Sequence, residues 1–457
     1  MYLPDTIVAP ATAPGVGALA IIRLSGPRAF EILHAIWRPT REGNPRELVV
    51  GDIIDPSTGA HLDRAMVVTF PKPKSFTGED VAELHCHGGI YLTRRIIAVA
   101  ISHGARIAEP GEFTRRAFLN GRIDLAEAEA VADLVSARSE SALRQALDQL
   151  SGNLSKKVND LGKKIVNIRA HLEVEIDFSD EDIAMPSRHS MTEEIERVIG
   201  DVAVLHDSFS RGRVVREGAR AAIIGKPNVG KSSLLNLMLG TDRAIVTAIP
   251  GTTRDVIEDV VQLGVHAITL LDTAGIRTGR DEVERLGIER SHVALGNADL
   301  VLAVFDSSRP LDHEDLAVAR LCAGRAGVAL LNKADLPQIS GVAELRAAGI
   351  TMPILAISAL IGDGLPALRD ELARAVDALG APGGASELAI SRERHRDALE
   401  RALVSLRIAR ASVLERMPPE ISAVDITAAA EALGAITGEV TGEDVLDAIF
   451  REFCIGK

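Results

Sequence analysis

Residues 222–233 read AIIGKPNVGKSS, and this stretch decides the fold of the region around it. A short apolar run leads into the pattern G-x-x-x-x-G-K-S, and an apolar helical pattern begins at Leu234. Gly225 and Gly230 allow the backbone to curl so that successive N–H groups point inward at phosphate oxygens. The stretch predicts a phosphate-binding loop between a strand and a helix; a plain glycine turn before a helix is the alternative.

Two side chains of this loop carry the expected chemistry. Lys231 supplies a positive charge for the β- and γ-phosphates, and Ser232 offers a hydroxyl to a magnesium ion. The helix that begins there directs the positive end of its dipole at the same anion. The loop is therefore expected to hold a nucleotide triphosphate with Mg²⁺.

Strand–helix alternation continues from Gly218 to about Gly380. The apolar runs expected to form strands are Ala221–Ile224, Ala267–Leu271, Leu300–Phe305, Val328–Leu331 and Ile354–Ile357. Five such strands separated by helical stretches predict a doubly wound parallel sheet that binds its nucleotide at the carboxyl ends.

Three tetrapeptides follow the loop in the required order. Residues 272–275 (DTAG) close a strand, where an aspartate reaches magnesium through water and a glycine N–H meets the γ-phosphate. Residues 252–255 (TTRD) lie between the two, where a threonine hydroxyl reaches the same metal. In residues 332–335 (NKAD), Asp335 accepts two hydrogen bonds from guanine that adenine does not offer. Together the four motifs predict a guanine-nucleotide hydrolase.

One expected residue is absent from this set. In Ras-like switches a glutamine directly follows the DTAG motif and orients the attacking water. Here that position is Ile276, which has no polar group. The sequence leaves two readings open: a poor hydrolase, or an enzyme in which another group does this work.

The composition limits the remaining possibilities. A length of 457 residues suggests two to four domains, and 46% hydrophobic with 3% aromatic residues predicts cores of Leu, Ile, Val and Ala. No apolar run approaches the ~18 residues of a membrane span, and the first residues lack the pattern of a signal peptide. Three widely spaced cysteines exclude a disulfide framework, so a cytoplasmic protein is expected. The net charge of −13 argues against indiscriminate nucleic-acid binding but permits a local basic patch for a specific RNA.

Residues 1–122 are expected to form a mixed α/β block. Strands are predicted at Ala18–Leu24 and Met66–Phe70, and helices at Arg28–Ile36 and Ile90–His103. The run 85–89 (HCHGG) invites a metal reading, but adjacent residues of a strand point to opposite faces. A strand that ends in a Gly-Gly turn is the preferred interpretation.

Helical texture occurs on both sides of the nucleotide region. Long amphipathic helices are predicted at Leu125–Leu150, with Asp124 as N-cap, and at Leu154–Ile176, Thr192–Arg211, Ser391–Glu415 and Thr427–Leu433. The acidic run 177–182 (DFSDED) is interpreted as a solvated loop rather than a cation site. The shared composition favours one helical domain interrupted by an inserted nucleotide domain, with two separate helical domains as the alternative.

The sequence resembles the MnmE (TrmE) family of tRNA-modifying GTPases. The resemblance rests on GKPNVGKSS, IVTAIPGTTRD, DTAGIR, NKAD and the terminal FCIGK, together with DTIVAPAT, SFTGEDVAELHCHGG and PGEFTRRAFLNGRIDLAEAEA near the amino terminus. It covers nearly the whole chain, and the amino-terminal phrases and FCIGK are specific to this family. It implies a folate-binding and dimerisation domain at 1–122, a helical domain at 123–217 and 381–457, and an inserted G domain at 218–380.

The family resemblance also implies a reaction. Such a protein works as a homodimer with the FAD-dependent MnmG, in a heterotetramer. The complex adds an aminomethyl or carboxymethylaminomethyl group to C5 of the wobble uridine of certain tRNAs. The one-carbon unit comes from a tetrahydrofolate derivative, in the 5-formyl or 5,10-methylene form.

Folate contacts are implied at Arg23, Glu83, Arg122 and Lys457. A cation suits the anionic tail of folate, and a carboxylate suits the donors of the pterin ring. A Lys at the position of Arg122 in other members would keep the charge but change the geometry. Cys454 is either a nucleophile or acid/base at the folate site, or part of a frayed tail.

The nucleotide contacts implied by the motifs and the resemblance fall into five groups. They are Asn228, Val229, Gly230, Lys231, Ser232 and Ser233; Thr247, Ala248, Ile249, Pro250, Gly251, Thr252 and Thr253; Asp272, Thr273, Ala274 and Gly275; Asn332, Lys333, Ala334 and Asp335; and Ser358, Ala359 and Leu360. Ser232 and Thr253 are the expected magnesium ligands.

A potassium ion is expected to replace the catalytic cation of Ras-like systems. Asn228 offers a neutral oxygen beside the phosphates, and Thr247, Ile249 and Thr252 offer further oxygens, a set that suits a large monovalent ion. Ordering of that loop would let two G domains meet. Glu284, in DEVER after the DTAG motif, is the expected residue that orients the water, with a solvated charge as the plainer reading.

Two other functions share the nucleotide motifs. A ribosome-assembly or RNA-binding GTPase normally carries a basic RNA-binding domain, which this acidic chain does not display. A dimerising mechanical GTPase without small-molecule chemistry is the third candidate. Folate binding by residues 1–122 separates the first hypothesis from both.

Overall fold

The computed structural model describes residues 5–177, 188–242, 259–271, 295–380 and 388–457. The chain divides into two compact units. One contains residues up to 132 and the carboxyl-terminal residues from 434 onward, and the other contains most of 133–433. The four-part domain division expected from the sequence stays a prediction.

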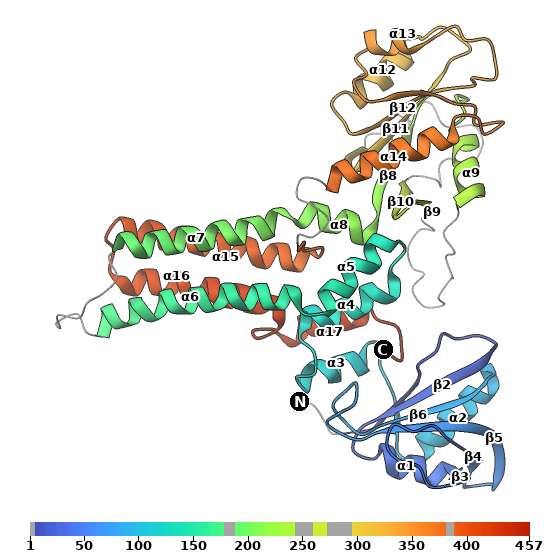
Figure 1. The fold of residues 1–457 in the computed structure, drawn as a ribbon, viewed down its shortest axis with the longest axis vertical. Coiled ribbons are helices and arrows are strands. Elements are labelled where there is room, and N and C mark those ends of the chain that lie inside the picture. Colours follow the sequence, from blue (N-terminus) through green and yellow to red (C-terminus); the bar gives the residue numbers. More distant parts are fainter. Residues whose placement is uncertain (1–4, 178–187, 243–258, 272–294, 381–387) are drawn as a thin grey trace. The chain divides into compact units, whose positions relative to one another are not determined.

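The amino-terminal unit is built on a seven-stranded sheet of order β3-β4-β5-β6-β2-β1-β7 (Figure 1). The strands are β1 (Ile7–Pro10), β2 (Gly17–Ser25), β3 (Trp37–Pro39), β4 (Val49–Asp55), β5 (Ala60–Phe70), β6 (Val81–Gly88) and β7 (Arg106–Ile107). Only the β1–β7 pairing is parallel. The expected strands at 18–24 and 66–70 lie within β2 and β5.

Apolar and charged side chains alternate along parts of β2 and β6, so the two faces of this sheet differ. Ile22, Leu24 and Leu84 are buried in one core with side chains of α1 (Ala29–Ile36) and α2 (Ile90–Ser102). Because neighbouring residues of a strand point to opposite sides, Arg23 and Glu83 lie on the other face. Helices α1 and α2 match the expected ranges, so the order of strands and helices in this region was predictable from its sequence.

The run 85–89 forms the end of β6 and the start of α2, with Gly89 as the N-cap. Cys86 is buried, and burial raises the pKa of its thiol to about 11. No group of His, Cys, Asp and Glu suited to a metal ion occurs among the described residues. The strand interpretation is confirmed.

The rest of this unit joins distant parts of the chain. Helix α3 (Glu112–Leu119) and the start of α4 (Leu125–Ser136) pack with α17 (Glu443–Arg451) through Leu125, Leu446 and Phe450. Helix α17 was not expected. Five of its nine residues are apolar, but a helix this short is marginal by itself and is stabilised by burial against α4.

The G domain contains a six-stranded sheet of order β13-β12-β11-β8-β10-β9. Its strands are β8 (Ala219–Ile224), β9 (Asp259–Leu263), β10 (His266–Leu271), β11 (Leu300–Asp306), β12 (Gly327–Asn332) and β13 (Ile354–Ala356). The five expected strands, β8, β10, β11, β12 and β13, pair in parallel as predicted. The sixth strand was not expected: β9 pairs antiparallel with β10. A two-residue Gly264-containing turn joins these strands, which leaves no room for a crossover helix.

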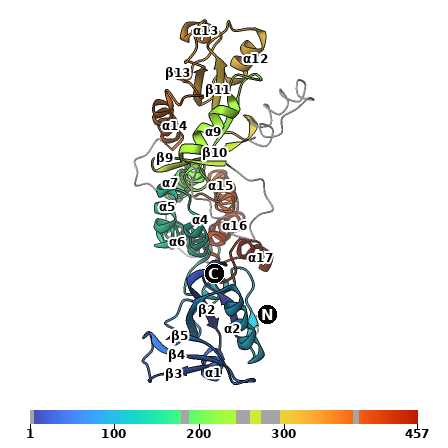
Figure 2. The same cartoon turned by 90° about the vertical axis from the view of Figure 1, so that its right-hand side faces the viewer.

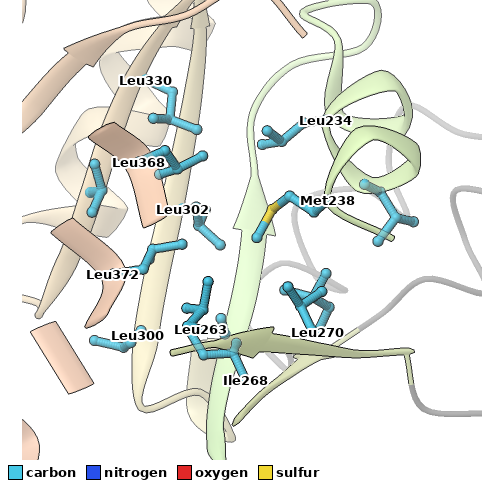
Figure 3. Packing of buried hydrophobic residues seen from close by; sticks show 14 of the residues in the cluster. Leu234, Met238, Leu263, Ile268, Leu270, Leu300, Leu302, Leu330, Leu368 and Leu372 are labelled. Atoms are coloured by element: carbon cyan, nitrogen blue, oxygen red, sulfur yellow. The ribbon is translucent and has the colours of Figure 1, made fainter. Parts of the chain in front are cut away.

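Helices cover both faces of the G-domain sheet. Leu234 and Met238 of α9 (Lys231–Asp242) and Leu368 and Leu372 of α14 (Leu365–Gly380) pack onto one face, beside Leu302 (Figure 3). On the other face, α12 (His313–Cys322) and α13 (Val342–Ala347) bury their own apolar side chains. This arrangement places the phosphate loop and the NKAD motif at the carboxyl ends of β8 and β12.

The helical region differs from the expectation in two places. The predicted helix 125–150 is two helices, α4 and α5 (Glu140–Leu150), because Ser139 adopts an extended conformation and its hydroxyl caps the N–H of Ala142 at 3.1 Å. The predicted helix 192–211 is likewise α7 (Arg188–Asp207) followed by α8 (Phe209–Glu217). At that break, Ser208 Oγ donates to Leu205 O and accepts from Ile390 N. Serine competes with the helix for these groups, which periodicity does not reveal.

The discontinuous helical domain is confirmed. Helix α7, before the G domain, packs along α15 (Glu393–Leu414), which follows it (Figures 1 and 2). Helices α6 (Asn153–Asp177) and α16 (Pro419–Thr437) extend the same bundle, and α16 is longer than expected. Asp124 caps α4 as predicted, accepting from Glu127 N at 2.9 Å. The expected loop at 177–182 lies almost wholly outside the described residues. In the described part of the chain, no helix is long and apolar enough to cross a membrane.

Candidate functional site

The phosphate loop joins the end of β8 to α9, which begins at Lys231. Asn228 has a positive φ of 63°, and Gly230 has a φ of 102°. A Cβ on Gly230 would lie 2.0 Å from Asn332 Nδ2, so only glycine fits there. Val229 is buried, whereas Ser232 and Ser233 are exposed in the first turn of α9. The loop therefore turns its backbone and hydroxyl groups toward solvent at a helix N-terminus.

Lys231 reaches back over this loop. Its ammonium donates to the carbonyl oxygens of Gly225 at 2.6 Å and Lys226 at 2.7 Å. Burial lowers the pKa of Lys231, because an ammonium is less stable away from water. A phosphate oxygen at the loop would provide the opposite charge that this ammonium lacks.

Lys226 anchors the loop from the other side. Its ammonium is buried between Asp312, which it contacts directly, and Asp315 at 3.1 Å. Burial acts to lower the pKa of Lys226, but the two aspartates raise it overall. Hydrogen bonding to Lys226 in turn lowers the pKa of Asp312. The loop is thus fixed to the N-terminus of α12, a contact that the sequence motifs did not predict.

The NKAD motif lies beside the same loop. Asn332 donates to Val229 O at 2.7 Å and accepts from Ala359 N at 2.9 Å, so it joins the phosphate loop to residues 358–360. Lys333, with a positive φ of 66°, pairs with Asp306 at 2.6 Å. Asn332 is therefore a structural centre of the site.

Asp335 follows this motif with its carboxylate held in place. Ser358 Oγ donates to Asp335 Oδ1 at 2.5 Å, while Ala334 N donates to Ile357 O at 3.0 Å. Leu360 is exposed. The geometry brings residues 332–335 and 358–360 together, as a guanine site requires.

Twelve of the expected site residues lie outside the described residues. They are Thr247, Ala248, Ile249, Pro250, Gly251, Thr252, Thr253, Asp272, Thr273, Ala274, Gly275 and Glu284. Of the expected metal ligands, Asn228 and Ser232 are described. The residue roles assigned from the sequence remain predictions.

A second cluster lies on the face of the amino-terminal sheet opposite the core with α1 and α2. Arg23 Nε donates to Glu83 Oε1 at 2.8 Å across the β2–β6 pair. The Arg23 guanidinium carbon is 5.7 Å from the ring centre of Phe76 and 5.6 Å from that of Phe113. Aromatic rings at this distance attract a cation, and Phe76, whose side chain is exposed, also offers a flat ligand a surface for stacking. The sequence reading missed both phenylalanines, since isolated aromatic residues carry no spacing signal.

The carboxyl terminus packs against the same unit. Phe113 N donates to Lys457 O at 3.1 Å, and Gly111 N donates to Cys454 O at 3.4 Å. Ile455 forms an antiparallel bridge with Pro110. The tail is therefore held by α3 and the residues before it, and Cys454 is half-buried rather than part of a frayed end.

Arg122 approaches the cluster from the loop after α3. A Cβ on Gly78 would lie 3.3 Å from Arg122 Cγ, which places its aliphatic stem against the segment that carries Phe76. We call Arg23, Glu83, Phe76, Phe113 and Lys457 the Arg23 cluster. These residues come from four distant parts of the sequence. Within the amino-terminal region, only Arg23 and Glu83 of this cluster were expected from the sequence.

Comparison with known families accounts for both regions. Residues 6–122 match the model of the GTP-binding protein TrmE N-terminus, and residues 125–454 match that of the MnmE helical domain. The chain belongs to the MnmE family. The resemblance drawn from the motifs is therefore confirmed.

Curated MnmE relatives match the chain from end to end. The tRNA modification GTPase MnmE of Natranaerobius thermophilus is 41% identical over 456 residues, 99% of each chain. That of Heliobacterium modesticaldum is 45% identical over 468 residues, again 99% of each. The chain is thus an MnmE-type GTPase with an inserted G domain.

Among solved structures, the G domain of the T. maritima FeoB iron transporter is 25% identical and covers 34% of this chain and 98% of its own, with a TM-score of 0.25. The sheet order, the four motifs and the match to MnmE relatives identify the G-domain fold.

Proposed function

We propose that this MnmE-family protein couples GTP hydrolysis to modification of the wobble uridine of certain tRNAs. The proposal rests on one observation: relatives named tRNA modification GTPase MnmE match all three regions of the chain without interruption. With an FAD-dependent partner of the MnmG type, in a heterotetramer, the protein adds an aminomethyl or carboxymethylaminomethyl group at C5.

The Arg23 cluster is the proposed folate site. Glu83 accepts the N–H donors of a reduced pterin, the exposed ring of Phe76 stacks on it, and Arg23, Arg122 and Lys457 balance the anionic tail. Support comes from the 2.8 Å Arg23–Glu83 pair and from the docking of the carboxyl terminus beside Phe113. The bound 5-formyl or 5,10-methylene derivative supplies the one-carbon unit, and Cys454 acts on it as nucleophile or acid/base.

In the G domain, Ser232 and Thr253 are proposed to hold Mg²⁺. Asn228, Thr247, Ile249 and Thr252 hold K⁺, and Glu284 orients the water. Support comes from the exposed Ser232 hydroxyl and from the positive φ of Asn228, which belongs to the same turn. Hydrolysis then requires potassium and contact between two G domains of a homodimer, in the cytoplasm. The assigned domains are 1–122, 123–217 with 381–457, and 218–380.

Nucleoside analysis tests the function directly. Transfer RNA is purified from cells that lack the protein, and from the same cells carrying wild type, Cys454→Ser or Asp335→Asn. We expect loss of the modified wobble uridine without the protein, recovery with wild type, and no recovery with either variant. Unchanged nucleosides in the deletion strain would refute the proposal.

The Cys454→Ser variant distinguishes the role of the carboxyl-terminal tail in modification from GTP hydrolysis. The purified variant is expected to hydrolyse GTP at the wild-type rate, because the tail and the nucleotide motifs lie in different compact units. Normal modification by this variant would leave Cys454 with only the structural role that its backbone already has.

A further inference from the structure

One side chain beside the Arg23 cluster has no role in the function proposed above. His85 follows Glu83 by two residues on β6 and therefore lies on the same face of the sheet. Its cross-strand neighbours are Ile21 on β2 and Met66 on β5, both apolar. An imidazole is thus inserted between two apolar side chains, directly next to Glu83.

The ring nitrogen nearest Glu83 is buried and unsatisfied. His85 Nε2 makes no hydrogen bond with any described residue, and the side chain is only 19% exposed. Its distance to Glu83 Oε2 is 3.5 Å, just beyond a normal hydrogen bond. Buried polar atoms are rarely left without a partner, because losing water without replacement costs free energy. An apolar side chain would suit the neighbours better, so packing alone does not explain a histidine here.

The two carboxylate oxygens of Glu83 face different partners. Oε1 accepts from Arg23 at 2.8 Å, whereas Oε2 faces His85 Nε2. A small rotation of the carboxylate or of the imidazole brings the second pair within hydrogen-bond distance. Glu83 is then held at both oxygens, and its remaining lone pairs can accept from a ligand.

We propose that His85 is a positioning residue of the Arg23 cluster. Its Nε2–H donates to Glu83 Oε2 and fixes the carboxylate in the orientation that receives the paired N–H donors of a heterocyclic ligand. This inference rests on the proposed function, because it assigns that ligand to the reduced pterin of a folate. His85 does not touch the ligand; it acts through Glu83.

Two substitutions at His85 distinguish hydrogen bonding from packing. His85→Gln keeps a donor of similar reach, whereas His85→Leu keeps an apolar volume that matches Ile21 and Met66. If His85 only fills space, ligand affinity should be kept in His85→Leu and reduced in His85→Gln. If His85 positions Glu83, ligand affinity should be reduced in His85→Leu and kept in His85→Gln. The matched control is His61→Leu, an exposed histidine on β5 that pairs with Asp52 instead.

The measurement is the affinity of the full-length protein for 5-formyltetrahydrofolate by titration calorimetry. We expect His85→Leu to raise Kd at least about tenfold, as for loss of a hydrogen bond to a charged group. We expect His85→Gln to stay within about threefold, and His61→Leu to bind as wild type. Trp37 is the only tryptophan and lies buried in β3, so its fluorescence during urea unfolding monitors this unit. His85→Leu should unfold at or above the wild-type midpoint.

The outcomes separate the two levels of the proposal. Wild-type affinity in His85→Leu, or equal losses in the Leu and Gln variants, overturns the role of His85 while leaving the folate site intact. Absence of binding by wild type overturns the folate site itself, and the inference falls with it.

Discussion

The phosphate loop and the Arg23 cluster, the proposed folate site, are built from different parts of the chain. The loop is a single run of residues. Its backbone N–H groups, its glycine turns and the N-terminus of the following helix form the phosphate site, together with the Lys231 side chain. The Arg23 cluster uses side chains from β2, β6, the 75–78 loop and α3, beside the backbone of the last residue. A local site such as the phosphate loop is encoded by a short motif. An assembled site such as the Arg23 cluster exists only when the sheet, α3 and the tail are correctly packed.

This difference predicts where each site is vulnerable. The loop should fail through changes at single backbone or motif positions. The assembled site should also fail through residues that never contact a ligand but hold α3 and the tail in place. The following experiments test this contrast, in order of expected effect.

The largest effect is expected at Arg116, which fixes α3 to the sheet. Its guanidinium is 1% exposed and contacts Asp5 at 2.5 Å, Glu112 at 2.9 Å and Glu79 at 3.2 Å. Arg116→Met removes the cation and leaves carboxylates in a partly buried site. We expect about 3 kcal/mol of destabilisation, the lower end for breaking a buried ion pair, because Arg106 still pairs with two of them.

The matched control is the next residue, Arg115, whose ion pair with Asp447 is more exposed. Arg115→Met should cost less than about 1 kcal/mol. Both variants are measured by urea unfolding with Trp37 fluorescence, and only Arg116→Met should lose folate affinity. Equal stability in the two variants would contradict the view that α3 is held by its buried cation.

The second effect concerns the catalytic step in the G domain. Glu284→Ala should lower GTP turnover at least ~10²-fold while leaving GTP binding unchanged, the lower range for a positioned acid/base residue. Glu282→Ala, two residues earlier in DEVER, is the control and should turn over normally. Turnover is measured by phosphate release in potassium and again in sodium, where the wild type should be slow. An active Glu284→Ala enzyme would return this residue to a solvated charge, and equal wild-type rates in the two salts would remove the potassium assignment.

The third effect concerns base selection. Asp335→Asn should lose at least about tenfold in GTP affinity and gain binding of xanthosine triphosphate, because an amide donates to the keto group that replaces the guanine amine. The matched control is Asp363→Asn, since Asp363 contacts Ser358 through its backbone. Competition with a fluorescent guanine nucleotide gives both affinities. Unchanged GTP affinity in Asp335→Asn would show that another residue reads the base.

The smallest effect is a pH dependence of the amino-terminal unit. Burial acts to raise the pKa of Glu112, but hydrogen bonds from Arg106, from Glu109 N and from Arg116 lower it overall, below its ordinary value of 4.5. A carboxylate with a lowered folded pKa contributes stability above its unfolded pKa and loses it as the pH falls through the folded value. The urea concentration at the midpoint of unfolding, followed by Trp37 fluorescence, should therefore decrease as the pH is lowered below about 4.5. In Glu112→Gln this part of the pH dependence should disappear; an unchanged slope would assign it to other carboxylates.

The elements that could be predicted were those with a clear apolar pattern. Helices α1, α2 and α6 repeat apolar residues at helical spacing, whereas β2, β8 and β11 are short, nearly continuous apolar runs, so their positions were readable. The breaks at Ser139 and Ser208 were not, because a serine that bonds the backbone interrupts a helix without disturbing its apolar pattern. Helix α17 depends on α3 and α4, far away along the chain, whereas β9 was missed although it pairs with the next strand, β10, through a two-residue turn.

The sequence by itself determined the G domain, because phosphate, metal and guanine recognition use contiguous motifs whose spacing follows from the backbone. It also determined the helical texture and the family. Only the tertiary structure decided that Lys226 is fixed by α12, that Asn332 joins the phosphate loop to residue 359, and that Arg23 lies between Phe76 and Phe113 beside the carboxyl terminus. The physical reason is the same in each case. Contacts between side chains far apart in the sequence follow from strand register and packing, which no local pattern encodes.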